Sequence, residues 1–254
     1  MLPMWRTRSA TVLAACTALA ATVSVAPATF ALQSPDHGGS PEPTSTLDVR
    51  DTADRAVQPT QDQLDAVRAI VRAAPQGARV TYDHRFGTPR TVLASQGTLT
   101  GPQDGDAAGI ARTWLRDNRG ALGLTAADVD SLALTGDHTL GTGTHAVSFR
   151  QTFGGVQTVH GGSMTVMVRD NGAVESYAGQ TARHADLSGG WRLSPAQALD
   201  GVAAELAGGV AFAPEATGQQ AGYTKFARGP FAAGSYVKKV AFVTDAGARP
   251  AYQV

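Results

Sequence analysis

An alternating run of side chains at residues 147–153 is the feature that most constrains the fold of this chain. Two sets of side chains take turns along it. One set consists of Val147, Phe149, Gln151 and Phe153, and the other of Ser148, Arg150 and Thr152. A period of two residues, with large apolar members in one set, is typical of a strand that buries one side only. We therefore expect a half-buried strand here.

Glycine pairs divide the residues that follow into further strands. Gly154-Gly155 predicts a turn, and Gly161-Gly162 predicts a bulge or bend. Asn171-Gly172 is a strong hairpin signal, because both residues accept the backbone conformations of a tight turn. The expected strands cover residues 156–160, 164–168 and 174–178. This region should therefore form antiparallel strands joined by short turns.

Capping residues predict helices before and after these strands in the sequence. Polar caps begin four apolar-periodic segments, at Thr60, Asp106, Thr125 and Ser194. The fourth helix should bury a stripe made of Leu199, Val202, Ala203 and Leu206. Two short strands are expected around FGTPR, residues 86–90, and two more around a turn at residues 245–247. A Gly-rich loop is expected between the fourth helix and these last two strands. The fold class predicted is α+β, with antiparallel sheets and helices packed on one face.

The first 31 residues have the features of a signal peptide. Arg6 and Arg8 precede an apolar run over residues 9–25, and small residues then allow cleavage after Ala28 or Ala31. No charged stop-transfer cluster follows, so we expect export and no stable membrane span. Acylation at Cys16 is the alternative, although apolar residues follow that cysteine.

Residues 32–59 are rich in Pro, Ser, Thr and Asp and are predicted to be a disordered linker. Cys16 is the only cysteine, so the exported chain could form no internal disulfide and no thiolate zinc site. The 21 basic and 21 acidic residues balance, and removal of residues 1–31 would leave 19 and 21. This charge gives no reason to expect a nucleic-acid partner.

The familiar catalytic motifs are missing from the sequence. It holds no H-E-x-x-H, no G-x-S-x-G and no phosphate-binding loop. His145 and His160 could meet across a hairpin, but two imidazoles make a poor zinc site, and the possible additions Asp137 and His138 fall in an expected glycine-rich loop. Asp128, two residues before Asp130, is interpreted as a solvated acid at a helix start. We predict no catalytic residue, no metal site and no cofactor in this chain.

The stretch from Thr144 to Gly179 resembles the FTP module, named for the fungalysin and thermolysin propeptides. The positions that match the module are His145, Phe149, Gln151, Phe153, Gly155, Val156, Gly161, Gly162 and Gly172. Gln157 and His160 depart from it, since they stand where the family commonly has a proline and an aromatic residue. Upstream and downstream segments extend the resemblance over residues 79–254. It implies a helix plus an FTP-like module over 60–182 and a PepSY-like element over 190–254, apparently truncated in its last strand.

The resemblance implies a cystatin-like or PepSY-like prodomain. Such a pro-region precedes a secreted zinc metallopeptidase domain, assists its folding and inhibits it until cleavage, so the precursor is a zymogen. The implied partner is the peptidase catalytic domain, joined in cis or bound in trans, and zinc would belong to that missing domain. The nine motif residues would then serve the fold or contact the protease. Two alternatives stay open: a stand-alone exported inhibitor or chaperone, and a cell-envelope binding module.

Overall fold

The structure, a computed structural model, describes residues 56–206, 212–244 and 247–254. All of these residues belong to one unit of the fold, which spans residues 47–254. The predicted signal peptide, its cleavage positions Ala28 and Ala31, Cys16 and most of the predicted linker lie outside the described residues. The linker's last residues do make contacts, because the Val57 N–H donates to the carbonyl of His84 at 2.7 Å.

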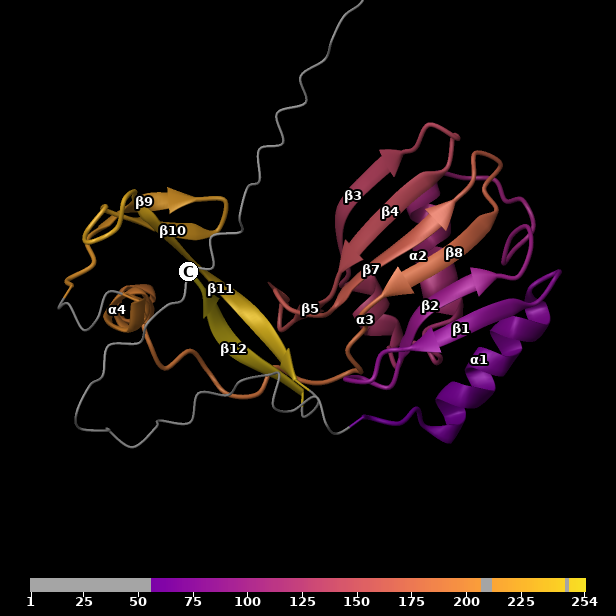
Figure 1. Ribbon diagram of the computed structural model, residues 1–254, viewed down its shortest axis with the longest axis horizontal. Coiled ribbons are helices and arrows are strands. Elements are labelled where there is room, and N and C mark those ends of the chain that lie inside the picture. The colour runs from indigo at the N-terminus through magenta and orange to yellow at the C-terminus, as the bar shows by residue number, and fades with distance from the viewer. Residues whose placement is uncertain (1–55, 207–211, 245–246) are drawn as a thin grey trace, which may run out of the picture. The chain divides into compact units, whose positions relative to one another are not determined.

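A six-stranded antiparallel sheet contains the alternating region (Figure 1). Its strands lie in the order β1-β2-β8-β7-β4-β3, so β8, the last of them in the sequence, pairs with β2. The strands are β1 (Ala78–Tyr82), β2 (Pro89–Ala94), β3 (Ala133–Thr139), β4 (His145–Arg150), β7 (Ser163–Val168) and β8 (Val174–Gly179). Strand β3 is therefore one edge of the sheet and β1 is the other.

Three helices pack on one face of this sheet and form its core. They are α1 (Gln61–Ala73), α2 (Ala107–Asp117) and α3 (Ala126–Asp130). The predicted caps begin them: Thr60 and Thr125 form capping boxes, and Asp106 accepts from the backbone of Gly109. The buried cluster joins Trp114 and Leu115 of α2 to the alternate residues of β4 and β7. The predicted fold class is confirmed: antiparallel sheets with helices on one face.

A second, four-stranded antiparallel sheet follows, in the order β12-β11-β10-β9. Its elements are α4 (Pro195–Leu206), β9 (Ala216–Gln220), β10 (Tyr223–Phe226), β11 (Ser235–Thr244) and β12 (Gly247–Gln253). Leu199 and Ala203 of α4 are fully buried, as predicted. The prediction for Leu206 was wrong, because 75% of it is exposed. It is the last residue of α4 and lies outside the buried cluster that Leu199 forms with Phe226 and Val237.

Three further expectations were wrong in local detail. Asp137 and His138 lie in β3, not in a glycine-rich loop, and β9 and β10 form a hairpin where a loop was expected. The half-buried strand does not run unbroken to Phe153. It stops at Arg150, and a separate two-stranded hairpin of β5 (Thr152–Phe153) and β6 (Val156–Gln157) follows. The backbone N–H of Gln151 still donates to the Gly162 carbonyl at 2.7 Å, in register with the β4–β7 pairs, so the chain leaves the large sheet only after Gln151.

Candidate functional site

The face of the six-stranded sheet opposite its helices carries mostly small side chains. The strand registers align one row across all six strands, consisting of Thr81, Thr91, Ala178, Thr165, Ser148 and Gly136. The neighbouring row consists of Arg79, Leu93, Ser176, Met167, Ala146 and His138. We call these twelve residues the open face. Figure 1 shows α2 and α3 behind the sheet, and no helix of the described ranges covers the open face.

Hydroxyl groups on the open face bond to one another across neighbouring strands. The side-chain oxygens of Thr81 and Thr91 lie 2.7 Å apart, and those of Ser148 and Thr165 lie 2.9 Å apart. Cross-strand pairs of this kind hold short side chains close to the sheet. Leu93, 44% exposed, adds an apolar side chain to the second row. The first row therefore offers short hydroxyl and methyl groups, and the second row adds the longer side chains of Arg79, Leu93, Met167 and His138.

A shallow cavity of about 330 Å³ lies along the open face between β2, β8 and β7. Thr91, Thr165 and Ala178 of the first row line it, together with Ser163 and Gln180. These groups can accept and donate hydrogen bonds and can pack against a partner, but they do not include a base poised against a nucleophile. A surface of this chemistry is suited to recognition.

Gln151 fixes the point where the chain leaves the sheet. It is 2% exposed, and its side-chain amide bonds the backbone of Ala182 twice. The Ala182 N–H donates to Oε1 at 2.9 Å, and Nε2 donates to the Ala182 carbonyl at 2.9 Å. A glutamine supplies both a donor and an acceptor, so it completes two backbone groups that would otherwise be buried without partners. Its place in the motif is therefore explained by the fold.

Gly161 and Gly162 make the bend that returns the chain to β7. Both have a positive φ, of 70° and 65°. A Cβ on Gly162 would lie 2.6 Å from the hydroxyl of Thr158, and one on Gly161 would lie 3.1 Å from the ring of Phe86. Only glycine fits this combination of backbone conformation and close approach. The bend also places Thr158 beside Ala241 of β11, to which it forms a parallel bridge.

Most of the nine motif residues face inward, away from any partner. The buried members are Phe149, Gln151, Phe153, Gly161, Gly162 and Gly172. His145, Gly155 and Val156 remain reachable, but His145 begins β4 while the other two lie in the hairpin beyond its far end. The structure does not gather the motif residues into one site. The open face was missed by sequence reasoning, although serines and threonines at alternate strand positions would have been the signal.

The two histidines weighed as a possible pair are separated by the length of β4. His145 pairs with Val168, at the opposite end of β7 from Ser163, and its Nδ1 lies 2.8 Å from a carboxylate oxygen of Asp137. His160 packs edge-on against the ring of Phe242, with ring centroids 5.9 Å apart. No group of three or more metal-binding side chains occurs within the described ranges.

One ionisable pair joins the helical side of the first sheet to the chain leaving β8. Nδ1 of His184 lies 2.9 Å from Asp128, whose carboxylate also completes the capping box of α3. The hydrogen bond and the charge of Asp128 raise the pKa of His184. Burial alone would raise the pKa of Asp128, but hydrogen bonds from Thr125 and His184 lower it overall. The pair links two segments and has no access to the open face.

One segment of the chain matches a known protein family. Residues 130–181 match the family model described as the Fungalysin/Thermolysin Propeptide Motif. The match confirms the FTP resemblance predicted from Thr144 to Gly179. The chain therefore contains a propeptide motif of the fungalysin and thermolysin type, and this motif covers β3 through β8.

A solved structure is also similar to the chain, at low identity. It is the Bacillus megaterium YpeB C-terminal domain, with a TM-score of 0.36, 13% sequence identity, and coverage of 78% of this chain and 86% of that one. No curated protein matches the chain. None of the helices in the described ranges is both long and apolar enough to cross a membrane.

Proposed function

We propose that this chain is the pro-region of a secreted fungalysin-like metallopeptidase, acting as folding assistant and inhibitor of the zinc peptidase domain. The observation that carries the proposal is the propeptide motif over residues 130–181, which supplies four of the six strands behind the open face. A segment of this family works by contact with a catalytic domain. In this proposal zinc is bound by the catalytic domain and not by residues of this chain.

The partner surface is the open face. It is formed largely by motif strands, and the hydroxyl and methyl groups of its first row suit packing against a second protein. The buried motif residues hold this surface in shape, because Gln151 and the two glycines of the bend fix where β4 ends and β7 begins. In this proposal the buried motif residues maintain the fold, and the open face contacts the peptidase domain.

The test measures inhibition of fungalysin-like catalytic domains from the source genome by the purified chain. Ala178→Arg places a long charged side chain in the first row of the open face, where Ala178 is exposed. Ala73→Arg is the matched control, because Ala73 is an exposed residue near the end of α1 on the opposite side of the sheet. We expect Ala178→Arg to raise the inhibition constant by about tenfold or more, the scale of a central interface residue, and Ala73→Arg to leave it unchanged.

Both variants should melt within a few degrees of the wild type, since exposed substitutions change stability by only about 0.5 kcal/mol. Absence of inhibition and of any gain in refolding yield with every such peptidase would overturn the pro-region proposal. Inhibition that survives Ala178→Arg would retain the pro-region and reject the open face as its contact. If the chain inhibits a peptidase that is encoded by a separate gene, it is a stand-alone inhibitor that acts in trans.

A further inference from the structure

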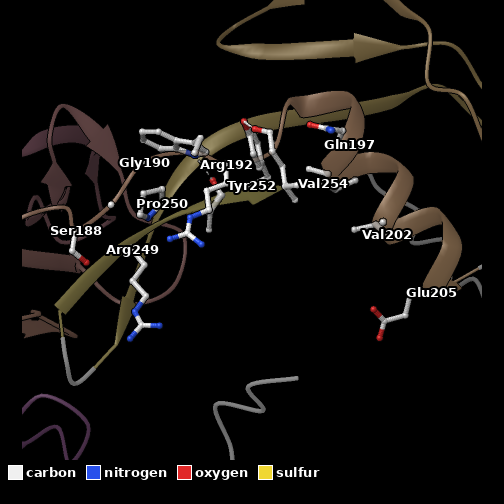
Figure 2. Close-up of a pocket in the computed structure, with 16 residues that line it drawn as sticks. Ser188, Gly190, Arg192, Gln197, Val202, Glu205, Arg249, Pro250, Tyr252 and Val254 are labelled. Carbon is white, nitrogen blue, oxygen red and sulfur yellow. Dashed lines mark hydrogen bonds between the residues drawn. The ribbon is translucent and has the colours of Figure 1, made fainter. Parts of the chain in front are cut away.

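The second sheet carries a cavity of its own, unrelated to the open face (Figure 2). Its volume is about 810 Å³, within the range of ligand-binding sites. It lies between α4, the segment over residues 188–193, and β12. The apolar part of its lining includes Trp191, Leu193, Val202 and Tyr252.

The aromatic part of the lining is held in place by hydrogen bonds. The indole Nε1 of Trp191 donates to the carbonyl of Ala251 at 3.0 Å, and the Tyr252 hydroxyl donates to the carbonyl of Leu193 at 2.7 Å. The ammonium of Lys239 lies 5.0 Å from the Trp191 ring centroid, a cation–π contact. Side chains tied in this way need little ordering when a ligand binds.

Two arginines stand at the mouth of the cavity without partners. Figure 2 shows the side chains of Arg192 and Arg249 extending to the same side of β12. No hydrogen bond or ion pair joins either guanidinium to another residue within the described ranges. Guanidinium groups bind carboxylates through two parallel hydrogen bonds, so a pair of free arginines beside an apolar lining favours a ligand with an acid group.

Strand β12 offers main-chain groups beside the same cavity. It is the outermost strand of its sheet and pairs with β11 on one side. On the other side the Ser188 N–H donates to the carbonyl of Ala248 at 3.0 Å, and no further backbone bond joins residues 189–193 to β12. Pro250 takes one N–H donor away from this edge. The cavity beyond Ala248 therefore gives an extended segment room beside β12, with only part of the usual set of backbone partners.

We propose that this cavity binds an extended peptide that carries a carboxylate. The carboxylate pairs with Arg192 and Arg249, and a neighbouring apolar side chain packs on Trp191 and Tyr252. Glu205 lines the opposite wall, on α4, and repels a second acid group there, which fixes the direction of the peptide. The site lies outside the propeptide motif and stands whether or not the open face binds a peptidase.

The test uses calorimetric titration of the full chain with acetyl-Val-Glu-Val-Glu-Val-amide and with the same peptide carrying Gln in place of Glu. We expect the Glu peptide to bind about tenfold tighter or better. Arg192→Gln and Arg249→Gln should each weaken its binding severalfold, and Glu205→Gln should strengthen it. Arg72→Gln, at an exposed arginine of α1, is the control and should change nothing. Each variant is checked for an unchanged melting temperature.

Two further probes identify the source of the carboxylate and test a different occupant. A Val-Gln-Val-Gln-Val peptide with a free C-terminus that binds as tightly as the Glu peptide would assign the acid to a chain end, which supports the site. Vesicles of phosphatidylglycerol that bind the chain through the two arginines, with no peptide binding, would overturn the proposal in favour of a membrane surface. Equal affinity for the Glu and Gln peptides, or no binding at millimolar peptide, would also reject it.

Discussion

Replacing Gln151 by leucine should destabilise the whole first sheet module. The change keeps the approximate size of the side chain but removes both of its bonds to Ala182, each 2.9 Å long. Gln151 is 2% exposed and Ala182 is 2% exposed, so water does not readily replace these partners. Each buried polar group left unpaired costs about 1–3 kcal/mol, which gives about 2–6 kcal/mol for the pair. The total stability of a domain is about 5–15 kcal/mol, so the loss would be large.

Replacing Gln151 by glutamate separates the two bonds. The carboxylate still accepts from the Ala182 N–H, but when ionised it cannot donate to the Ala182 carbonyl and is buried beside it. Burial and this carbonyl raise the pKa of the introduced acid in the folded state. Stabilisation by the protonated form is therefore full below the unfolded glutamate pKa of about 4.3 and is lost as the pH rises towards the folded value.

Urea denaturation followed by circular dichroism measures both effects. The difference in unfolding free energy between Gln151→Glu and the wild type should shrink from pH 7.5 to pH 4.5, whereas that for Gln151→Leu should stay constant. Gln157→Leu is the control, because Gln157 is only partly buried in β6, and it should change stability by about 0.5 kcal/mol or less. A loss below about 1 kcal/mol for Gln151→Leu would refute the reasoning that buried backbone groups depend on this amide.

Two more outcomes follow from named contacts. Gly172→Ala should lower the free energy of unfolding, measured by heat or urea, by about 3 kcal/mol or more, because φ is 77° and the new Cβ would lie 1.9 Å from the carbonyl oxygen of Gln103. Gly97→Ala is the control: its φ is 70° but the space around it is open, so it should lower the free energy of unfolding by only about 1 kcal/mol. Equal losses in the two variants would contradict the clash with Gln103. His184, with its pKa raised by Asp128, should stabilise the fold fully below about pH 6.5 and lose this contribution as the pH rises through its folded pKa. The contribution of His184 to wild-type stability should therefore be larger at pH 6 than at pH 8, and His184→Gln should reduce this change in unfolding free energy between the two pH values. If the change is the same in the variant, the His184–Asp128 pair does not cause it.

Local sequence rules were enough to place the helices. The capping box of Thr60 and Gln63 forms as predicted, with the Gln63 N–H donating to the threonine hydroxyl at 3.2 Å and the Thr60 N–H donating to Gln63 Oε1 at 2.9 Å. Ser194 and Gln197 make the same reciprocal bonds at the start of α4. Each of these patterns is complete within four residues, so it can be recognised without knowledge of distant contacts. The burial of Val147 and Phe149 followed equally directly from their spacing.

Two edge strands, β3 and β9, escaped prediction because their stability comes from their neighbours. Strand β3 is largely exposed and shows no alternation of apolar residues, so only its pairing with β4 reveals it. Strand β9 is exposed at every position and is held by β10 through a turn at Ala221 and Gly222, both with positive φ. The open face was missed for a related reason. Its rows join residues from six strands, and their register is a property of the assembled sheet.

The positions of the motif residues decide what the family resemblance can transfer to this chain. Gln151 and Gly162 are buried and meet geometric demands of the bend, which any chain with this fold must satisfy. Thr165 and Ala178 of the open face meet no such demand, since other short side chains would fit the same strand positions. The nine motif positions therefore account for the fold, while the proposed partner contact depends on open-face residues of the same strands that are not among the nine. A pro-region that binds a different peptidase should accordingly differ on the open face and keep the bend.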